Sequence, residues 1–148
     1  MKDCAHMIFR IAMMAMILVV LSLAVTRGPK AETVLEGIVT HVRDGDTIEV
    51  AGIAIRLQGL HAPELGEPGG YSARVFMLDL VEKKEIRCVL TGERSYNRII
   101  GVCYLDGLDI AAQLVQAGLG RDCPRYSGGK YRHLESHSAI EIHLPNYC

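Results

Sequence analysis

Charged side chains interrupt otherwise apolar segments of this chain at four places. Asp44 and Asp46 occupy a turn, Arg56 stands inside an apolar run, Glu64 follows a proline, and Arg98 precedes a second apolar run. Carboxylates can ligate a cation or accept a proton, and guanidinium groups suit the oxygens of an anion such as phosphate. Taken singly, each of these residues is more often a turn former, a solvent-facing strand charge or a loop charge. Their order along the chain must therefore decide whether they form a functional site.

The segments between these charges predict a mainly β domain with two helices. Apolar residues at helical spacing, from Ala73 to Val81, predict one helix, and Asp109 is placed to cap a second that ends at Gly118. Ala51-Gly52 is typical of a tight hairpin. Five runs rich in β-branched residues predict strands. They cover residues 34–42, 47–50, 53–57, 86–90 and 99–104.

The remaining segments are expected to be less regular. The polar segment 91–98 would join the last two strands, 123–131 would be irregular, and 130–140 would form one short helix. Five strands with a helix between the third and the fourth is the order of an OB-type barrel, although a generic α+β domain shows a similar pattern.

The charged segments belong to a longer ordered series of motifs. The series runs Asp44-Gly45-Asp46-Thr47, Ile55-Arg56-Leu57, Ala62-Pro63-Glu64, a helix, Tyr96-Asn97-Arg98, Asp106-Gly107 and Leu114–Gly118. Over residues 36–131 it resembles the staphylococcal nuclease (thermonuclease) family. Single motifs are weak evidence, whereas the whole series at compatible spacing is specific. The resemblance implies a β-barrel with helices (α+β), an OB-fold whose five-stranded barrel is of the staphylococcal nuclease type.

The resemblance also implies an activity, the metal-assisted hydrolysis of phosphodiester bonds in DNA or RNA. Carried over by position, Asp46 would bind a divalent cation, Ca²⁺ in this family, and Glu64 would be the general base. Arg56 and Arg98 would hold the phosphate. Guanidinium donors suit the charge that builds up on the phosphoryl oxygens during attack by water. We expect single-stranded nucleic acid as the partner, no protein partner, and a monomer.

One position departs from the family motif, because His61 and Ala62 stand where the family has a Ca²⁺-binding Asp and a Thr. Ca²⁺ takes about six to eight oxygen ligands, and an imidazole nitrogen is a poor substitute. Three alternatives stay open. Ca²⁺ binds more weakly through Asp46, backbone carbonyls, water and the substrate phosphate. The protein is a catalytically impaired OB-fold module that still binds a phosphate ligand. Or His61 and Asp46 recruit a softer ion such as Zn²⁺ or Mn²⁺.

The N-terminal segment predicts export. Lys2 and Arg10 precede an apolar run over residues 11–25 that only Ser22 interrupts. Such a run fits a signal-peptide core and is shorter than the roughly 20 residues that span a bilayer. We expect a signal peptide over 1–24 and a secreted or periplasmic protein, the alternative being a membrane anchor at 11–25. Residues 25–33 would be a linker, 34–140 the domain and 141–148 a tail.

Charge departs from the usual pattern of a nucleic-acid binder. Without residues 1–24 the chain carries 14 Lys and Arg against 16 Asp and Glu, whereas such proteins normally present a basic surface. A C-terminal group of basic residues either supplies the contact locally or is a solvated tail. It comprises Arg121, Arg125, Lys130, Arg132, His133 and His137.

Four cysteines follow the predicted signal peptide: Cys88, Cys103, Cys123 and Cys148. An even number in an exported domain predicts disulfides, and three connectivities are open. No two are spaced as C-x-x-C, which argues against structural zinc. The family resemblance places Cys88 and Cys103 at core positions of paired strands. On that basis we expect Cys88–Cys103 and Cys123–Cys148, with buried free thiols as the alternative.

Overall fold

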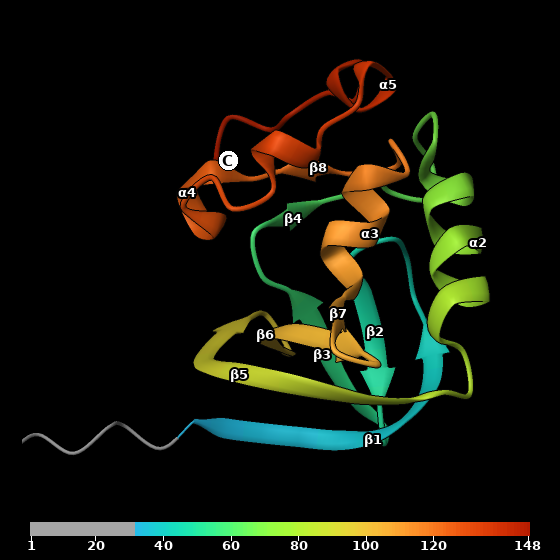
Figure 1. The fold of residues 1–148 in the computed structure, drawn as a ribbon, viewed down its shortest axis with the longest axis vertical. Coiled ribbons are helices and arrows are strands. Elements are labelled where there is room, and N and C mark those ends of the chain that lie inside the picture. Colours follow the sequence, from blue (N-terminus) through green and yellow to red (C-terminus); the bar gives the residue numbers. More distant parts are fainter. Residues whose placement is uncertain (1–31) are drawn as a thin grey trace, which may run out of the picture. The chain divides into compact units, whose positions relative to one another are not determined.

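One long strand organises the sheet (Figure 1). In the computed structural model, which describes residues 32–148, β1 (Thr33–Val42) pairs antiparallel with both β2 (Thr47–Val50) and β5 (Glu85–Ser95). Beyond β2 lies β3 (Ile53–Leu57), and beyond β5 lies β6 (Arg98–Leu105). Strands β3 and β6 also pair, in parallel, so the sheet curls round until its ends meet. These five strands form the predicted OB-type barrel.

Three very short strands complete the β-structure of residues 32–148, and none of them was predicted. β7 (Leu108–Asp109) extends the sheet beyond β6. β4 (Leu60–His61) and β8 (Arg121–Asp122) form a separate antiparallel pair. Strands of two residues are too short to show an alternating pattern in the sequence. The β4–β8 pair joins the segment before Glu64 to the C-terminal region.

The two predicted helices are confirmed and lie over one end of the barrel (Figure 1). Helix α2 (Gly70–Val81) buries Ala73, Met77 and Val81. Helix α3 (Ile110–Gln116) begins as expected, because the Asp109 carboxylate accepts hydrogen bonds from two backbone N–H groups of its first turn, at 3.0 and 3.3 Å. Barrel and helices share one apolar core. Its fully buried side chains include Val39, Val42, Ile48, Ile55, Leu57, Met77, Ile110 and Leu114.

The polar segment 91–98, predicted as a connection, is mostly strand. β5 continues to Ser95, β6 starts at Arg98, and only Tyr96 and Asn97 form the turn. The sequence misleads because this end of the hairpin projects from the barrel and has polar side chains on both faces, which removes the alternation typical of a half-buried strand. In the structure Ser95 and Arg98 form a cross-strand pair.

The C-terminal region differs from the prediction of one helix over 130–140. It contains the short helix α4 (Pro124–Ser127), a 3₁₀ helix η1 (Arg132–Leu134) and the short helix α5 (His137–Ile140). Glu135 breaks the predicted helix with an extended backbone. Its carboxylate accepts a hydrogen bond from the Asp122 N–H at 2.9 Å, a contact between β8 and η1 that local sequence cannot show.

Both predicted disulfides are present. Cys88 and Cys103 are directly opposed on β5 and β6, with Cα atoms 4.0 Å apart. Cys123, at the start of α4, is bonded to Cys148, with Cα atoms 4.6 Å apart. The second bridge fixes the last residue of the chain beside α4 (Figure 1).

The predicted signal peptide or anchor over 1–24 lies outside the described residues, as does most of the predicted linker. Within residues 32–148, no helix combines the length and apolar character needed to cross a membrane. Residues Glu32–Cys148 form one compact unit, in which β1 starts at Thr33. The proposed boundary between domain and tail at residue 140 stays a prediction.

Candidate active site

The turn between β1 and β2 places Asp46 against the core. Gly45 allows this close packing, since a Cβ there would lie 2.7 Å from the Ala62 Cβ and 2.8 Å from the Ala73 Cβ. The Asp44 carboxylate accepts a hydrogen bond from the Asp46 N–H at 2.9 Å, which shapes the turn. Asp46 is 4% exposed, so its carboxylate points into the protein.

Arg56 meets that carboxylate from the neighbouring strand. Its Nη1 lies 2.9 Å from Asp46 Oδ2, because β2 and β3 place Thr47 and Arg56 opposite each other. Burial raises the pKa of Asp46 to about 7, although the Arg56 guanidinium acts to lower it. The carboxylate therefore depends on Arg56 for its charge near neutral pH. The Nε and Nη2 of Arg56 make no hydrogen bond to the described residues and are open to an anion.

Thr47 connects this ion pair to Arg98. The fully buried Thr47 hydroxyl donates to Asp46 Oδ1 at 3.1 Å and accepts from Arg98 Nη1 at 2.9 Å. Ser95 holds the same guanidinium from the other side, since its carbonyl and hydroxyl oxygens accept from Nε and Nη2 at 3.4 and 3.1 Å. Three of the predicted site residues, Asp46, Arg56 and Arg98, thus belong to one hydrogen-bonded network.

Glu64 lies at the edge of this network and not in it. Its side chain is exposed, and its carboxylate makes no hydrogen bond or ion pair to residues 32–148. It comes two residues after Ala62, whose N–H donates to Asp46 Oδ2 at 3.3 Å, and two extended residues span about 7 Å. Gly70 fixes the loop, because a Cβ there would lie 1.9 Å from the Glu64 carbonyl oxygen. The backbone of Glu64 is thus close to the network.

His61 turns toward the C-terminal tail. The residue is 7% exposed, and its Nε2 lies 3.0 Å from the carbonyl oxygen of His143. Because a carbonyl only accepts, Nε2 carries the proton and is not free to ligate a metal. Burial also lowers the pKa of the imidazole, so the ring is neutral at neutral pH. His61 therefore ties the tail to β4.

The residues present do not fit the Ca²⁺ site that the family resemblance implied. Among residues 32–148, no group of three or more His, Cys, Asp or Glu side chains could hold a metal ion. Asp46 is the one buried carboxylate of the network, and both of its oxygens already accept hydrogen bonds. A Ca²⁺ cage needs about six to eight oxygen ligands, and the chain does not supply them here.

A hollow of about 460 Å³ opens beside the two arginines. Its lining brings Arg56 of β3 together with Arg98 of β6, and adds residues from the β5–β6 turn, α4 and the tail. Three exposed tyrosines also line it, Tyr96, Tyr126 and Tyr147. Sequence reasoning named Tyr96 only as part of a motif and missed the other two. Tyr126 and Tyr147 stand close to Cys123 and Cys148 in the sequence, so the predicted disulfide could have indicated that they lie in the same region.

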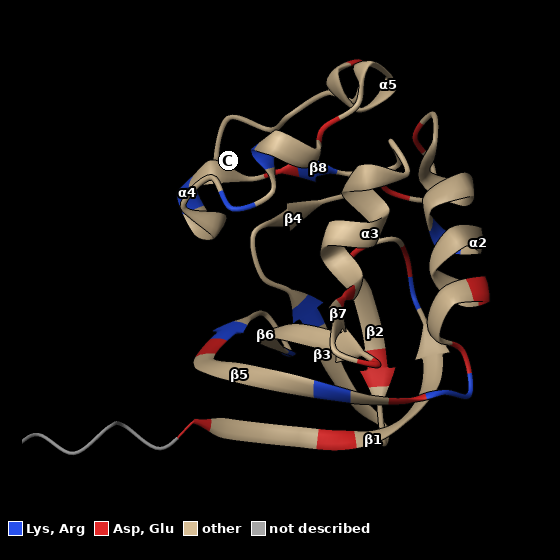
Figure 2. Ribbon diagram, viewed as in Figure 1, with Lys and Arg blue, Asp and Glu red and all other residues tan. Residues whose placement is uncertain are grey.

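The basic C-terminal group is only partly available to a ligand. Arg121 is mostly buried, lies 3.5 Å from Glu135 and donates to the Ile142 carbonyl at 3.1 Å. Lys130 is paired with Asp109 at 2.6 Å. Figure 2 shows basic and acidic residues interspersed along the ribbon in this region. Part of the group therefore holds the C-terminal segments together.

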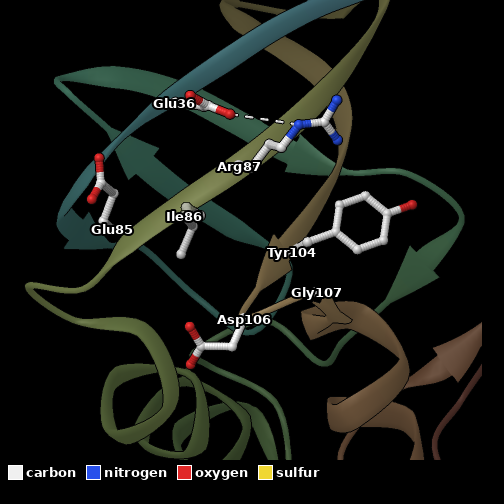
Figure 3. A pocket seen from close by; sticks show the side chains of 7 residues that line it. All are labelled: Glu36, Glu85, Ile86, Arg87, Tyr104, Asp106 and Gly107. Atoms are coloured by element: carbon white, nitrogen blue, oxygen red, sulfur yellow. Dashed lines mark ion pairs between the residues drawn. The ribbon is translucent and has the colours of Figure 1, made fainter.

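A second hollow, of about 530 Å³, lies over β1, β5 and β6 and has the opposite charge. Its lining contains three carboxylates, those of Glu36, Glu85 and Asp106, and a single cation, Arg87 (Figure 3). Arg87 is paired with Glu36 at 3.6 Å, and both side chains are exposed. A phosphate would be repelled here, which leaves the Arg56–Arg98 hollow as the candidate anion site.

Comparison with known proteins agrees with this geometry. The family model described as staphylococcal nuclease homologue matches residues 54–141, more than half of the chain. The chain belongs to the staphylococcal nuclease homologue family. The match includes Arg56, Glu64 and Arg98, whereas Asp46 precedes it and Tyr147 and Cys148 follow it.

Several curated relatives of this family member are named as nucleases. An uncharacterised endonuclease of Escherichia coli is 35% identical over 89 residues, which are 57% of this chain and 58% of the relative. A micrococcal nuclease of Shigella flexneri is 36% identical over 72 residues, 46% of this chain and 41% of the relative. The succinoglycan biosynthesis protein ExoI of Rhizobium meliloti is 33% identical over 102 residues, 61% of this chain and 53% of the relative. The chain thus spans about half the length of most of these relatives.

Proposed function

We propose that this protein is a nuclease that hydrolyses phosphodiester bonds of nucleic acid bound at the Arg56–Arg98 hollow. One observation carries the proposal: guanidinium groups from two strands distant in sequence are braced by the same Asp46–Thr47 pair at a single hollow. Membership of a family with several named nucleases supports the reaction class.

The proposed mechanism assigns one task to each group. Arg56 and Arg98 bind the phosphoryl oxygens and stabilise the negative charge that grows on them as water attacks phosphorus. Asp46 and Thr47 hold the two guanidinium groups in place. The Glu64 carboxylate takes the proton of the attacking water, a contribution of about 10² to 10⁴ in rate. As the new P–O bond forms, the P–O bond to the leaving sugar oxygen breaks, and that oxygen takes a proton from solvent water. The Glu64 side chain is exposed, is free of partners among the described residues and does not line the hollow, so it would have to turn toward a bound phosphate.

The test is an assay of the full chain on denatured DNA and on RNA, with Ca²⁺, with Mn²⁺ and with EDTA, beside Glu64→Gln. Loss of about 10²-fold or more in Glu64→Gln, with unchanged thermal stability, is expected. The described protein groups do not form a cation site on their own. Comparing the assays with Ca²⁺, Mn²⁺ and EDTA therefore shows whether a cation binds together with the substrate. Activity unchanged by both EDTA and Glu64→Gln would contradict the mechanism.

A second function, binding of nucleic acid or another phosphate ligand without turnover, is favoured by the positions of His61 and Glu64. The imidazole faces the tail, and the carboxylate lies outside the arginine network. This function predicts oligonucleotide binding that Arg56→Ala and Arg98→Ala abolish, and no product with any of the metals. The activity assay and a binding measurement together distinguish the two functions, because binding with product formation indicates a nuclease and binding without product indicates a binding module.

We also propose that the protein acts outside the cytoplasm. Its two disulfides support this location, because such bridges persist in oxidising compartments, and the apolar run over 11–25 supports an export signal. Cell fractionation with N-terminal sequencing of the recovered protein tests the proposal and the predicted cleavage near residue 24.

A further inference from the structure

The loop between β4 and α2, which carries Glu64, is closed on itself by a second glutamate three positions further along (Figure 1). The Glu67 carboxylate accepts a hydrogen bond from the Glu64 N–H at 2.9 Å. In the opposite direction, the Glu67 N–H donates to the Glu64 carbonyl at 2.8 Å. The two residues are thus joined by one bond to the Glu67 side chain and one between main chains.

The closed loop is also fixed to the start of α2. The Gly70 N–H donates to the Glu67 carbonyl at 3.1 Å, and the Ala73 N–H donates to the Gly69 carbonyl at 2.9 Å. Gly69 has a φ of 89°, a left-handed conformation that favours glycine. A Cβ on Gly70 would collide with the Glu64 carbonyl. The backbone of Glu64 therefore packs closely against the first turn of the helix.

The carboxylate of Glu64 has no comparable support. It makes no hydrogen bond or ion pair to residues 32–148. Since no described group holds this side chain, the place from which the proposed base acts is set by its backbone. Among the described residues, Glu67 provides the one side-chain hydrogen bond to that backbone.

We propose that Glu67 is a positioning residue for Glu64, whose backbone it holds so that the carboxylate can reach the attacking water. The inference rests on the proposed function and adds a residue to its mechanism. A base that is already in place lowers the entropic cost of the reaction. Neither glutamate lines the Arg56–Arg98 hollow, so loss of this bond should slow the chemical step and leave substrate binding unchanged.

The charge of Glu67 is also felt nearby. Burial lowers the pKa of His61, and the Glu67 carboxylate acts in the opposite direction. The carboxylate is thus close both to the Glu64 backbone and to the residue that anchors the tail. Its charge and its hydrogen bond can be separated, because glutamine loses the charge and keeps an oxygen that accepts a hydrogen bond.

The test measures kcat and KM of the full chain on denatured DNA, with the metal that gives the highest activity. Glu67→Leu removes the acceptor and should lower kcat about tenfold, the size of one hydrogen bond, with KM unchanged. Glu67→Gln should keep the wild-type kcat. If Glu67 were itself the base, Glu67→Gln would lose as much activity as Glu67→Leu.

Glu82→Leu is the matched control, because Glu82 is an exposed glutamate at the other end of α2 whose side chain makes no hydrogen bond or ion pair to the described residues. It should change neither constant. In a protein that already carries Glu64→Gln, adding Glu67→Leu should cost nothing further, because no base is left to position. A purely structural role would cost the same with and without Glu64.

Hydrogen exchange of the Glu64 amide, followed by NMR, gives a result that does not depend on activity. Exchange should be faster in Glu67→Leu than in wild type, and should stay at the wild-type rate in Glu67→Gln and Glu82→Leu. Melting temperatures of all variants exclude unfolding as the cause.

A wild-type kcat in Glu67→Leu would overturn the inference, as would equal losses in Glu67→Gln and Glu67→Leu or an unchanged exchange rate of the Glu64 amide in Glu67→Leu. The proposed function fails in a different way, and the inference with it. In that case wild type forms no product, or Glu64→Gln keeps the wild-type kcat. If Glu64→Gln loses activity and Glu67→Leu does not, the base stands and the positioning role is wrong.

Discussion

The molecule has two hollows of similar volume, about 460 and 530 Å³, that differ in how their charges are held. In the first, Arg56 and Arg98 are braced by buried partners. In the second, Arg87 makes an exposed pair with Glu36 at 3.6 Å, and the lining adds the carboxylates of Glu85 and Asp106 (Figure 3). Exposed ion pairs of this kind contribute about 0 to 1 kcal/mol. The first hollow is therefore the one that suits a phosphate, because its two arginines are fixed, whereas carboxylates outnumber the cation in the second.

Two Asp-Gly turns beside these hollows show the same contrast. Gly45 packs against Ala62 and α2 with no room for a side chain, whereas a Cβ on Gly107 would meet nothing within 4 Å. One turn is part of the core and carries a buried carboxylate. The other, which includes Asp106, is an exposed connection. The dipeptide is the same in both, and packing decides which turn positions a site.

The largest effect is expected from removing one braced guanidinium. Arg98→Ala should lower kcat/KM on denatured DNA by about 10² to 10³, because a fixed donor to the transition-state charge is lost. Arg98→Lys should restore little, since an ammonium group cannot reproduce the bonds to Thr47 and Ser95 together. Arg87→Ala, in the acidic hollow, is the control and should keep wild-type activity. Equal losses in Arg98→Ala and Arg87→Ala would abolish the distinction between the hollows.

A second prediction concerns the packed turn. Gly45→Ala should reduce the free energy of unfolding by about 2 kcal/mol, because its methyl group overlaps Ala62 and Ala73. Gly66→Ala is the matched control, since its Cβ would meet no atom within 4 Å, and it should change stability little. Urea unfolding monitored by circular dichroism gives both values. A Gly45→Ala protein as stable as Gly66→Ala would mean that this turn is no more tightly packed than an open loop.

Thr47→Val should have a smaller effect, of about tenfold on kcat/KM. The substitution keeps the shape of the side chain but leaves Asp46 Oδ1 and one Arg98 N–H without their shared partner. Leaving such buried polar groups without a partner costs about 1 to 3 kcal/mol of interaction free energy. Thr40→Val removes an exposed hydroxyl that donates to the Glu49 carbonyl and serves as the control. Steady-state kinetics should give a lower kcat/KM for Thr47→Val than for Thr40→Val. Equal kcat/KM values in the two variants would mean that Thr47 does not hold the site in place.

The smallest effect is expected at the contact between His61 and the tail. Burial lowers the pKa of this imidazole below its usual 6.5, so the unfolded chain binds the proton more readily. The contribution of neutral His61 to the free energy of unfolding is therefore complete above pH 6.5. It is lost as the pH falls through the lower pKa that His61 has in the folded protein. His61→Gln should therefore lose less stability between about pH 7.5 and about pH 5 than wild type. His133→Gln, at an exposed position, should follow wild type in urea unfolding at both pH values, and equal pH responses in all three proteins would contradict the prediction.

The barrel was predictable because long strands and helices show their periodicity in the sequence. The resemblance to the staphylococcal nuclease family implied Asp46, Arg56 and Arg98 as site residues, and the structure joins the three through Thr47. Short elements such as β4 and β8 were not predictable, because two residues show no period. The orientation of His61 depends on the tail more than eighty positions away, so no local pattern could reveal it.

The most direct test of the central claim is an NMR titration with a single-stranded oligothymidylate, following the Nε–H resonances of the arginine side chains. The account predicts that the Arg56 and Arg98 signals shift with saturation while that of Arg87 stays in place. Shifts confined to Arg87, or absent from both Arg56 and Arg98 at concentrations that saturate binding, would contradict it.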